Sequence, residues 1–168
     1  MQRCAWVIKG DELYEKYHDE EWGVPCHDDG KMFEFIVLES AQAGLSWRTV
    51  LGRREGYRKA FADFDAQKVA QFTEADVERL MQDVGIIRNR QKIMAAITNA
   101  KVFLEIQKEF GSFSTYMWGF TDAQVLAKDL RRRGFGFFGP TIAYAHMQAL
   151  GLVNDHDADC FRNSRFKT

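Results

Sequence analysis

Cysteine and histidine are scarce in this chain, and four of them lie near its two ends. They are Cys4, His18, His156 and Cys160. The last two stand four residues apart, so one helical turn would point both side chains at one place. Two thiolates and two imidazoles suit tetrahedral zinc, and four protein ligands leave no position for a reactive water, so such a site would be structural. Cys26 and His27 are rival ligands, and spacing alone leaves metal binding open.

Glu39 interrupts an apolar segment. The sequence predicts a helix over 31–43 that is apolar nearly all round, as buried helices are. Glu39 falls on the same helical face as Met32, Phe35, Ile36 and Ala43. A carboxylate is costly to bury unless it is paired or functional, so this position indicates a site with a perturbed pKa. A buried acid that only caps a loop or accepts a backbone hydrogen bond is the alternative.

Large aromatic residues surround this segment in the sequence. They are Trp6, Tyr14, Tyr17, Trp22 and Trp47. If they converge beside the acid, they form a receptor for a flat cationic ring, because the aromatic faces and the carboxylate both favour positive charge. Aromatic residues are 14% of the chain, however, and most of them must belong to the core.

A glycine-centred turn over 83–89 separates two predicted helices and resembles a helix-hairpin-helix. Asn89 is a candidate cap for the second helix, whose N-terminal N–H groups would suit a phosphate. Arg88, Arg90 and Lys92 add positive charge there. The second glycine usual in that motif is missing, so an ordinary turn between helices is the alternative.

The elements that must position these residues are predicted to be helices throughout. Their expected ranges are 11–18, 31–43, 47–61, 73–82, 89–108, 112–118, 122–132 and 140–150. Thr73 and Thr121 each begin a capping-box pattern, and Pro140 suits a first helical turn. Strand patterns are weak, and 134–139 is predicted to be a turn-rich connector.

Length and composition indicate one globular domain over 1–168. The chain has 168 residues, of which 46% are hydrophobic and 28% charged. No apolar run is longer than that at 93–97, which is far below the roughly 18 residues of a membrane span. The N-terminus lacks the apolar stretch of a signal peptide, so a cytoplasmic location is expected.

Charge is unevenly distributed, although the formal net charge is −1. Acidic residues dominate 11–30, where Lys16 is the single base. Basic residues cluster at 48–59, 88–92, 128–133 and 162–167. This segregation permits an anionic partner, while simple solvation of the outer helix faces is the alternative.

Five blocks of sequence carry a resemblance to a known family. They are RCAW (3–6), YHDEEWG (17–23), LESAQAGLSW (38–47), GIIR (85–88) and GLVNDH (151–156). Together and in this order they resemble the 3-methyladenine DNA glycosylase I family, over nearly the whole chain. The resemblance implies an all-α helix-hairpin-helix DNA glycosylase fold, with the N- and C-terminal segments joined by a zinc site. The stretch between Trp118 and Lys128 is shorter than in that family.

The resemblance also implies an activity. The protein would be a base-excision repair enzyme that binds double-stranded DNA containing alkylated bases and flips out N3-methyladenine. It would hydrolyse the glycosidic bond without a lyase step, leaving an abasic site and free 3-methyladenine. One structural zinc would be held by the two cysteines and two histidines near the chain ends. A monomer is expected, since such an enzyme wraps a duplex from one side.

The family's motifs imply residue roles as well. Glu39 would be the catalytic group, and the base would be bound by Tyr17, Trp47, Tyr14, Trp22 and Trp6. Gly44 and Leu45 match the loop that fills the gap left in the duplex. The hairpin would contact DNA through Gly85, Ile86, Arg88 and Arg90. Relatives in the superfamily commonly place a catalytic aspartate beyond the hairpin; this family lacks it, and the sequence offers no candidate.

Two other classes of function fit parts of the pattern. A DNA-binding module that recognises lesions without catalysis would keep the metal site and the hairpin, but it would have little reason to bury Glu39. A hydrolase or deaminase with a catalytic zinc would need an open coordination position, which a site with four protein ligands does not provide.

Overall fold

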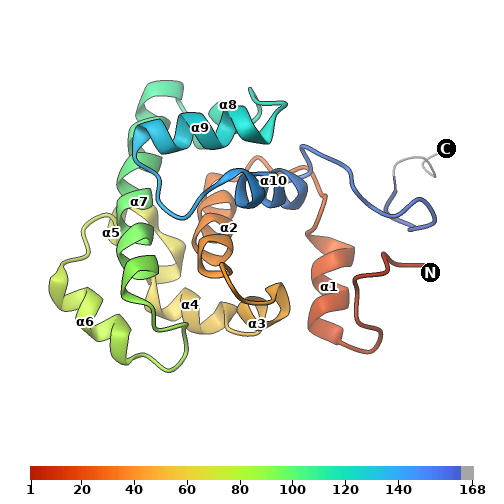
Figure 1. The fold of residues 1–168 in the computed structure, drawn as a ribbon, viewed down its shortest axis with the longest axis horizontal. Coiled ribbons are helices and arrows are strands. Elements are labelled where there is room, and N and C mark those ends of the chain that lie inside the picture. Colours follow the sequence, from red (N-terminus) through yellow and green to blue (C-terminus); the bar gives the residue numbers. More distant parts are fainter. Residues whose placement is uncertain (164–168) are drawn as a thin grey trace.

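The computed structural model describes residues 1–163, which form helices and no strand (Figure 1). In chain order the elements are α1 (Glu12–Glu20), α2 (Asp29–Ala41), α3 (Trp47–Leu51), α4 (Arg54–Ala60), a 3-10 turn (Ala62–Phe64), α5 (Ala66–Val69), α6 (Glu74–Gln82), α7 (Arg90–Phe110), α8 (Phe113–Met117), α9 (Ala123–Arg133) and α10 (Pro140–Ala149). The all-α prediction is confirmed for the described residues. Of the basic cluster noted at 162–167, residues 164–167 lie outside them. Within 1–163, no helix is both long and apolar enough to cross a bilayer.

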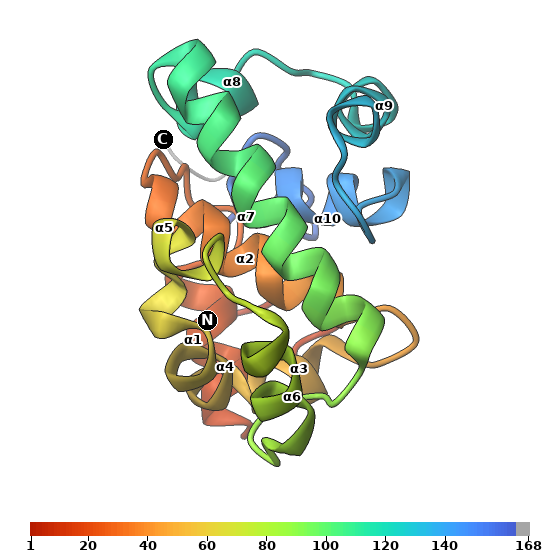
Figure 2. The same ribbon diagram turned by 90° about the vertical axis from the view of Figure 1, so that its left-hand side faces the viewer.

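The central helix of the fold is α2, which lies beside α7 and α10 (Figures 1 and 2). All residues over 32–41 are buried. Its first residue, Asp29, accepts hydrogen bonds from the backbone N–H groups of Phe113 and Ser114 at 2.8 Å, which fixes α8 against it. Burial on every side explains why this helix is apolar nearly all round, and it places Glu39, in the last turn, in the interior.

The hairpin expected over 83–89 joins α6 to α7, and the first turn of α7 holds the end of α2. Asn89 caps α7, as predicted, by accepting a hydrogen bond from the backbone N–H of Lys92 at 3.1 Å. The Lys92 ammonium donates to the carbonyl oxygens of Ala41 and Ala43 at 3.0 and 2.6 Å. These carbonyls lie at the end of α2, where no helical N–H remains to pair with them. One side chain thus ties the hairpin to the loop that follows α2.

The same hairpin packs against α4 without intervening side chains. A Cβ atom on Gly56 would lie 2.1 Å from the carbonyl oxygen of Gly85. We therefore expect Gly56→Ala to push the hairpin away from α4 and to lower the free energy of unfolding by about 1–3 kcal/mol. Urea unfolding measures this change.

Gly30→Ala is the matched control for that substitution. Gly30 is also helical, but its added Cβ would meet only a side-chain oxygen of Asp28, at 3.3 Å. Because alanine is the better helix former, this variant should be neutral or slightly stabilising. Equal stability of both variants would contradict the close approach of α4 and the hairpin.

The predicted connector over 134–139 is confirmed as a segment without helix or strand. Asn99, buried in α7, donates to the carbonyl oxygen of Gly136 at 3.0 Å and accepts from its N–H at 2.8 Å. Pro140 then occupies the first turn of α10, as predicted. The connector brings the chain back over α7, so that α10 can pack on α2 (Figure 2).

Three helix predictions were wrong in detail. The helix expected over 31–43 ends at Ala41, because Lys92 pairs with its last carbonyls and Gly44 turns the chain at φ 80°. Ala43 is therefore exposed and does not share the buried face of Glu39. The cap of α9 is Asp122 rather than the preceding threonine, since the carboxylate accepts backbone N–H groups at 2.7 and 3.1 Å. The capping box that begins at Thr73 is confirmed.

The third difference lies over 47–69. The helix expected over 47–61 is two helices, α3 and α4, separated at Gly52 and Arg53. After α4 the chain makes a 3-10 turn in which three non-glycine residues have positive φ angles between 51° and 58°. Nothing in the sequence predicts that turn or the short α5, because residues other than glycine seldom adopt this conformation.

The two ends of the described chain meet on the same side of the molecule (Figure 1). The backbone N–H of Phe161 donates to the carbonyl oxygen of Gln2 at 2.9 Å. This contact joins two segments without regular structure. It brings the cysteine and histidine near the N-terminal end close to the pair near the C-terminal end.

Candidate functional site

The four cysteine and histidine residues from the chain ends converge in one buried cluster. One ligand atom from each of Cys4, His18, His156 and Cys160 lies within 4.8 Å of all the others. The Cys4 sulfur is 3.4 Å from Nδ1 of His156, and the Cys160 sulfur is 3.4 Å from Nε2 of His18. Tetrahedral zinc, with bonds of about 2.3 Å to sulfur and about 2.0 Å to nitrogen, separates such atoms by about 3.6 Å. The spacing therefore fits a metal ion with four protein ligands.

The surroundings of the cluster fit thiolate and imidazole ligands. Each sulfur accepts a backbone N–H, from Asp157 to Cys4 at 3.3 Å and from Arg162 to Cys160 at 3.4 Å. The ring of His18 uses Nδ1 to contact Asp19 at 2.8 Å, which leaves Nε2 for the cluster. Such outer partners orient the ligands of metal sites.

Two expectations about this cluster are corrected by the structure. His156 and Cys160 lie in a turn, where the N–H of Cys160 donates to the carbonyl of Asp157 at 2.9 Å, and not on a helix. The rival ligand His27 is elsewhere, stacked on Trp118 with ring centroids 4.5 Å apart. Cys26, its neighbour, is not part of the cluster either.

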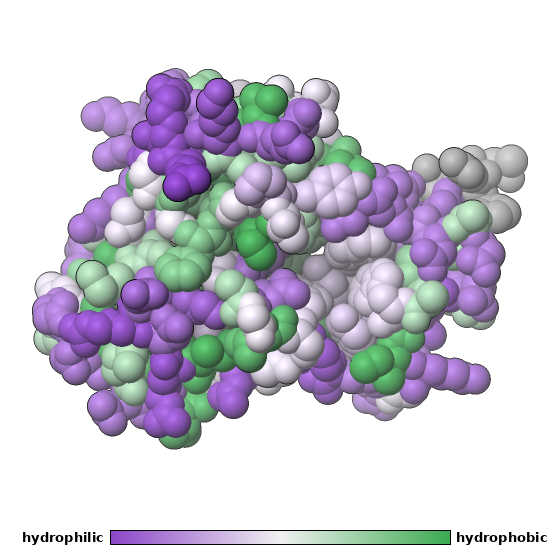
Figure 3. All heavy atoms as spheres, viewed as in Figure 1, coloured by the Kyte–Doolittle hydropathy of each residue, from purple (hydrophilic) through white to green (hydrophobic). Residues whose placement is uncertain are grey.

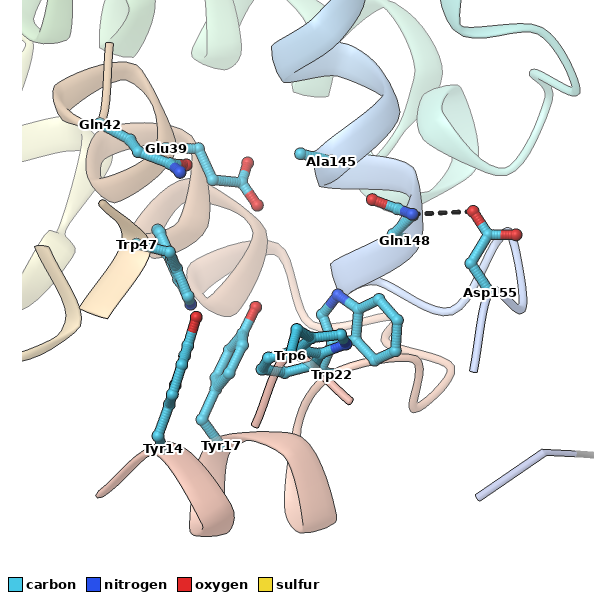
Figure 4. Close-up of a pocket in the computed structure, with 10 residues that line it drawn as sticks. All are labelled: Trp6, Tyr14, Tyr17, Trp22, Glu39, Gln42, Trp47, Ala145, Gln148 and Asp155. Atoms are coloured by element: carbon cyan, nitrogen blue, oxygen red, sulfur yellow. Dashed lines mark hydrogen bonds between the residues drawn. The ribbon is translucent and has the colours of Figure 1, made fainter. Parts of the chain in front are cut away.

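A cavity of about 300 Å³ lies beside this cluster, between the α1 side of the molecule and α10 (Figure 4). It is lined by Trp6, Tyr14, Tyr17, Trp22, Glu39, Gln42, Trp47, Ala145, Gln148 and Asp155. The structure thus brings together the carboxylate and all the aromatic residues that the sequence singled out. On the space-filling surface the cavity is a hollow bordered by residues of intermediate hydropathy (Figure 3).

The aromatic rings form one wall of the cavity. Trp6 packs edge-on against both Tyr14 and Trp22, with ring centroids 5.1 Å apart in each case. Tyr17 and Trp47 follow, with centroids 5.5 Å apart, and the Tyr17 hydroxyl points toward the side of Glu39 (Figure 4). The indole N–H of Trp47 is buried and has no hydrogen-bond partner within the described residues.

The cluster of two cysteines and two histidines supports this wall from behind. Trp22 lies edge-on against His156 with centroids 4.5 Å apart, and Trp6 lies edge-on against His18 at 5.3 Å. A change in the cluster must therefore move the aromatic rings that face the cavity.

The carboxylate on the opposite side of the cavity has a partner that the sequence did not indicate. Glu39 is 3% exposed, and its Oε2 lies 2.7 Å from Nδ1 of His146, which is fully buried in α10. Burial raises the pKa of Glu39, and the interaction with His146 opposes that increase. Burial, reinforced by Glu39, raises the pKa of Tyr17 well above its usual value, so this phenol is a neutral donor.

Four lining residues were missed by sequence reasoning. Gln42 follows α2, Ala145 and Gln148 belong to α10, and Asp155 accepts a hydrogen bond from Gln148 at 2.7 Å (Figure 4). The spacing of the polar residues at 148 and 155 does not indicate a site. They reach the cavity only because α10 packs on α2. His146 could have been noticed as a histidine in a largely apolar helix.

The loop and hairpin residues predicted to contact DNA lie outside the cavity. Gly44 and Leu45 are exposed in the loop between α2 and α3. At the hairpin, the N–H of Gly85 already donates to the carboxylate of Asp83 at 2.7 Å, and the Ile86 side chain is buried. The hairpin therefore offers fewer free backbone donors than the sequence suggests.

The two hairpin arginines differ in their surroundings. Arg90 forms ion pairs with Glu74 and Glu78 of α6, whereas Arg88 is exposed and pairs with no carboxylate of the described residues. We expect Arg88→Ala to weaken binding to duplex DNA and to reduce the slope of log K against log salt by about 0.9, the loss of one phosphate contact. Fluorescence anisotropy at several salt concentrations measures the slope.

Arg90→Ala is the comparison for that experiment, since it removes the same charge from a side chain already paired with two acids. The slope of log K against log salt should differ less from the parent value in Arg90→Ala than in Arg88→Ala. An unaltered slope for Arg88→Ala would contradict a phosphate contact at the hairpin.

Known proteins resemble this chain along nearly its whole length. A family model described as methyladenine glycosylase matches residues 6–126 and 121–163, and the two matches meet near the stretch expected to be shorter. The chain is 48% identical to DNA-3-methyladenine glycosylase 1 of Escherichia coli strain K12, over 95% of this chain and 96% of that protein. It is 44% identical to DNA-3-methyladenine glycosylase of Haemophilus influenzae, over 94% of this chain and 96% of that protein.

Solved structures show the same similarity. A crystal structure of 3-methyladenine DNA glycosylase I has a TM-score of 0.92 and 48% identity, and the similarity covers 96% of this chain and all of that one. A variant of 3-methyladenine DNA glycosylase I in complex with 3-methyladenine has a TM-score of 0.91 and 37% identity, and covers 97% of this chain and 98% of that one.

Proposed function

Since this chain belongs to the methyladenine glycosylase family, we propose that it excises N3-methyladenine from alkylated double-stranded DNA. The product would be free 3-methyladenine and an intact abasic site, formed by hydrolysis with no lyase step. We further propose that residues 1–168 act as one domain and as a monomer, in the cytoplasm, where bacterial DNA lies.

One observation carries this proposal: a buried acid faces a wall of aromatic rings across a cavity. N3-methylation gives adenine a positive charge while keeping it flat. The faces of Tyr17 and Trp47 and the carboxylate of Glu39 all favour such a ring over a neutral one. The cavity therefore selects for the charge that distinguishes the damaged base from adenine.

The base must leave the duplex to reach the cavity, because its reacting bond is covered in stacked DNA. Extrusion costs a few kcal/mol and is least costly for a damaged base. We place the exposed Gly44 and Leu45 in the gap that the base leaves. Lys92 holds this loop by its hydrogen bonds to the preceding carbonyls, so the loop would enter the duplex as a fixed element.

The chemistry needs little help from an acid. The cationic purine is already a good leaving group: when the bond from C1′ to N9 breaks, its electrons return to the ring and neutralise the charge. Water attacks C1′ and loses its proton to solvent. Glu39, in its ionised form, would accept hydrogen bonds from the donor edge of the base, while Tyr17 and Trp47 position the ring. A neutral adenine that entered the cavity would find no strong acid to protonate it, and would be spared.

We assign the metal site to zinc, held by Cys4, His18, His156 and Cys160. With four protein ligands the ion supplies a cross-link between the chain ends and no open position for a substrate or a water. These residues would instead keep Trp6 and Trp22 in place at the cavity wall.

Strand-break analysis tests the proposed reaction. Methylated duplex DNA incubated with the protein should break only after alkali treatment, because alkali cleaves abasic sites. Breaks without alkali would show a lyase step. Absence of alkali-sensitive sites, from folded protein that still binds the DNA, would favour a module that recognises lesions without catalysis.

A further inference from the structure

The acid in the cavity is paired with a residue far away in the sequence. Nδ1 of His146 lies 2.7 Å from Oε2 of Glu39, and both side chains are buried in the contact between α10 and α2. The Glu39 carboxylate faces the cavity (Figure 4), so one of its oxygens is bound to His146 and the other is left for a ligand.

The two ring nitrogens of His146 have different surroundings. Its second nitrogen, Nε2, is buried and has no hydrogen-bond partner within the described residues. The Phe138 ring packs edge-on against the His146 ring, with the two ring centroids 5.4 Å apart. The buried side chains of α9, which packs on α10, are all apolar. A proton on Nε2 would be a buried N–H without a partner, which is costly. A proton on Nδ1 is donated to Glu39 instead, so the geometry favours the arrangement in which Nδ1 is the donor.

Few other titratable groups of the described residues face Glu39. The Tyr17 phenol, from α1, interacts with the carboxylate but is neutral, because burial raises its pKa. Trp47, from α3, does not titrate. Among the described residues, the interaction with His146 is therefore what favours the ionised carboxylate, against the burial that disfavours it.

We propose that His146 is a positioning residue, which holds Glu39 in one orientation and keeps its carboxylate an acceptor for the extruded base. This inference rests on the proposed function, and it names a residue that acts on the base only through Glu39.

The consequence is a change in pH dependence. Hydrogen bonding to a carboxylate favours its ionised form, so loss of the donor must raise the pKa of Glu39 further. Excision by the parent protein should fall as the pH drops and Glu39 becomes protonated. Without the donor, that fall should begin at a higher pH, while the rate recovers in alkaline solution.

His146→Phe and His146→Asn form the test pair. Phenylalanine keeps a flat ring but no donor, whereas the asparagine amide can place a donor near the position of Nδ1. Single-turnover release of 3-methyladenine is measured across pH for both. In His146→Phe, we expect the pH at which the excision rate is half-maximal on the acid side to rise by about one unit or more, and the rate below that pH to fall at least tenfold. In His146→Asn, this midpoint should return toward the parent value. Met147→Leu, a conservative change next to it in α10, should leave the midpoint unchanged.

A purely structural role predicts a different result. The rate of His146→Phe would then fall equally at every pH, or not at all, and an unshifted midpoint would overturn the inference. If that variant does not fold, the ring ¹⁵N shifts of His146 in the parent protein decide: a neutral ring protonated on Nδ1 supports the inference, and one protonated on Nε2 overturns it. Failure of the parent itself to release 3-methyladenine would instead refute the proposed function.

Discussion

Glu39→Gln should slow the single-turnover release of 3-methyladenine by about a hundredfold or more, the usual cost of removing a preorganised electrostatic contact to a reacting group. The amide keeps the shape of the side chain but loses the negative charge that faces the cationic base. It also presents a donor where the base needs an acceptor. Rapid quenching with protein in excess over DNA separates this step from product release.

Stability provides the control for that variant. The pKa of Glu39 is raised in the folded protein, so the ionised carboxylate destabilises the fold increasingly as pH rises from its unfolded pKa toward its folded pKa. A neutral amide removes that penalty, and the thermal midpoint at neutral pH should stay the same or rise. Glu55→Gln makes the same chemical change at a side chain that is 74% exposed, and should leave the rate unchanged. An unchanged rate for Glu39→Gln would refute the role given to the carboxylate.

Cys160→Ser should produce the largest loss of stability. It removes one of four ligands whose metal would join the two ends of the chain. Structural zinc sites contribute many kcal/mol to the stability of small domains. Even if the free energy of unfolding falls by only about 3 kcal/mol, the melting temperature of this chain should fall by about 6–12 °C. Differential scanning calorimetry measures the shift, and native mass spectrometry should show one zinc ion in the parent protein and none in the variant.

Cys26→Ser is the matched control, because that thiol lies outside the cluster. Its melting temperature and zinc content should equal those of the parent. Base binding should weaken in Cys160→Ser, since Trp6 and Trp22 rest on the ligand histidines. A metal-free Cys160→Ser protein with unchanged stability would contradict a structural ion. A chemical step that failed without zinc in a protein that still bound the base would point to catalytic zinc.

The residues of the cavity were predictable where their types were out of place. Glu39 in an apolar helix and the nearby tryptophans and tyrosines could be selected from the sequence, and all of them line the cavity. The α10 residues could not, because their place depends on how one helix packs on another. His146 reaches Glu39 across a separation of 107 residues.

The fold predictions likewise succeeded where the responsible contacts are local and failed where they depend on tertiary structure. Caps at Asn89 and Thr73 were found because the responsible hydrogen bonds are local. The hairpin phosphate site was less well founded, since Asp83 binds the N–H of Gly85 and Arg90 pairs with acids of α6. Those contacts depend on tertiary structure, which residue spacing does not reveal.

The most direct measurement is chromatography of the bases released from methylated duplex DNA, with 3-methyladenine, 7-methylguanine and adenine followed in the same sample. We expect selective release of 3-methyladenine, with adenine retained in the DNA. No release of 3-methyladenine by folded, zinc-loaded protein that binds the duplex would contradict the proposed excision.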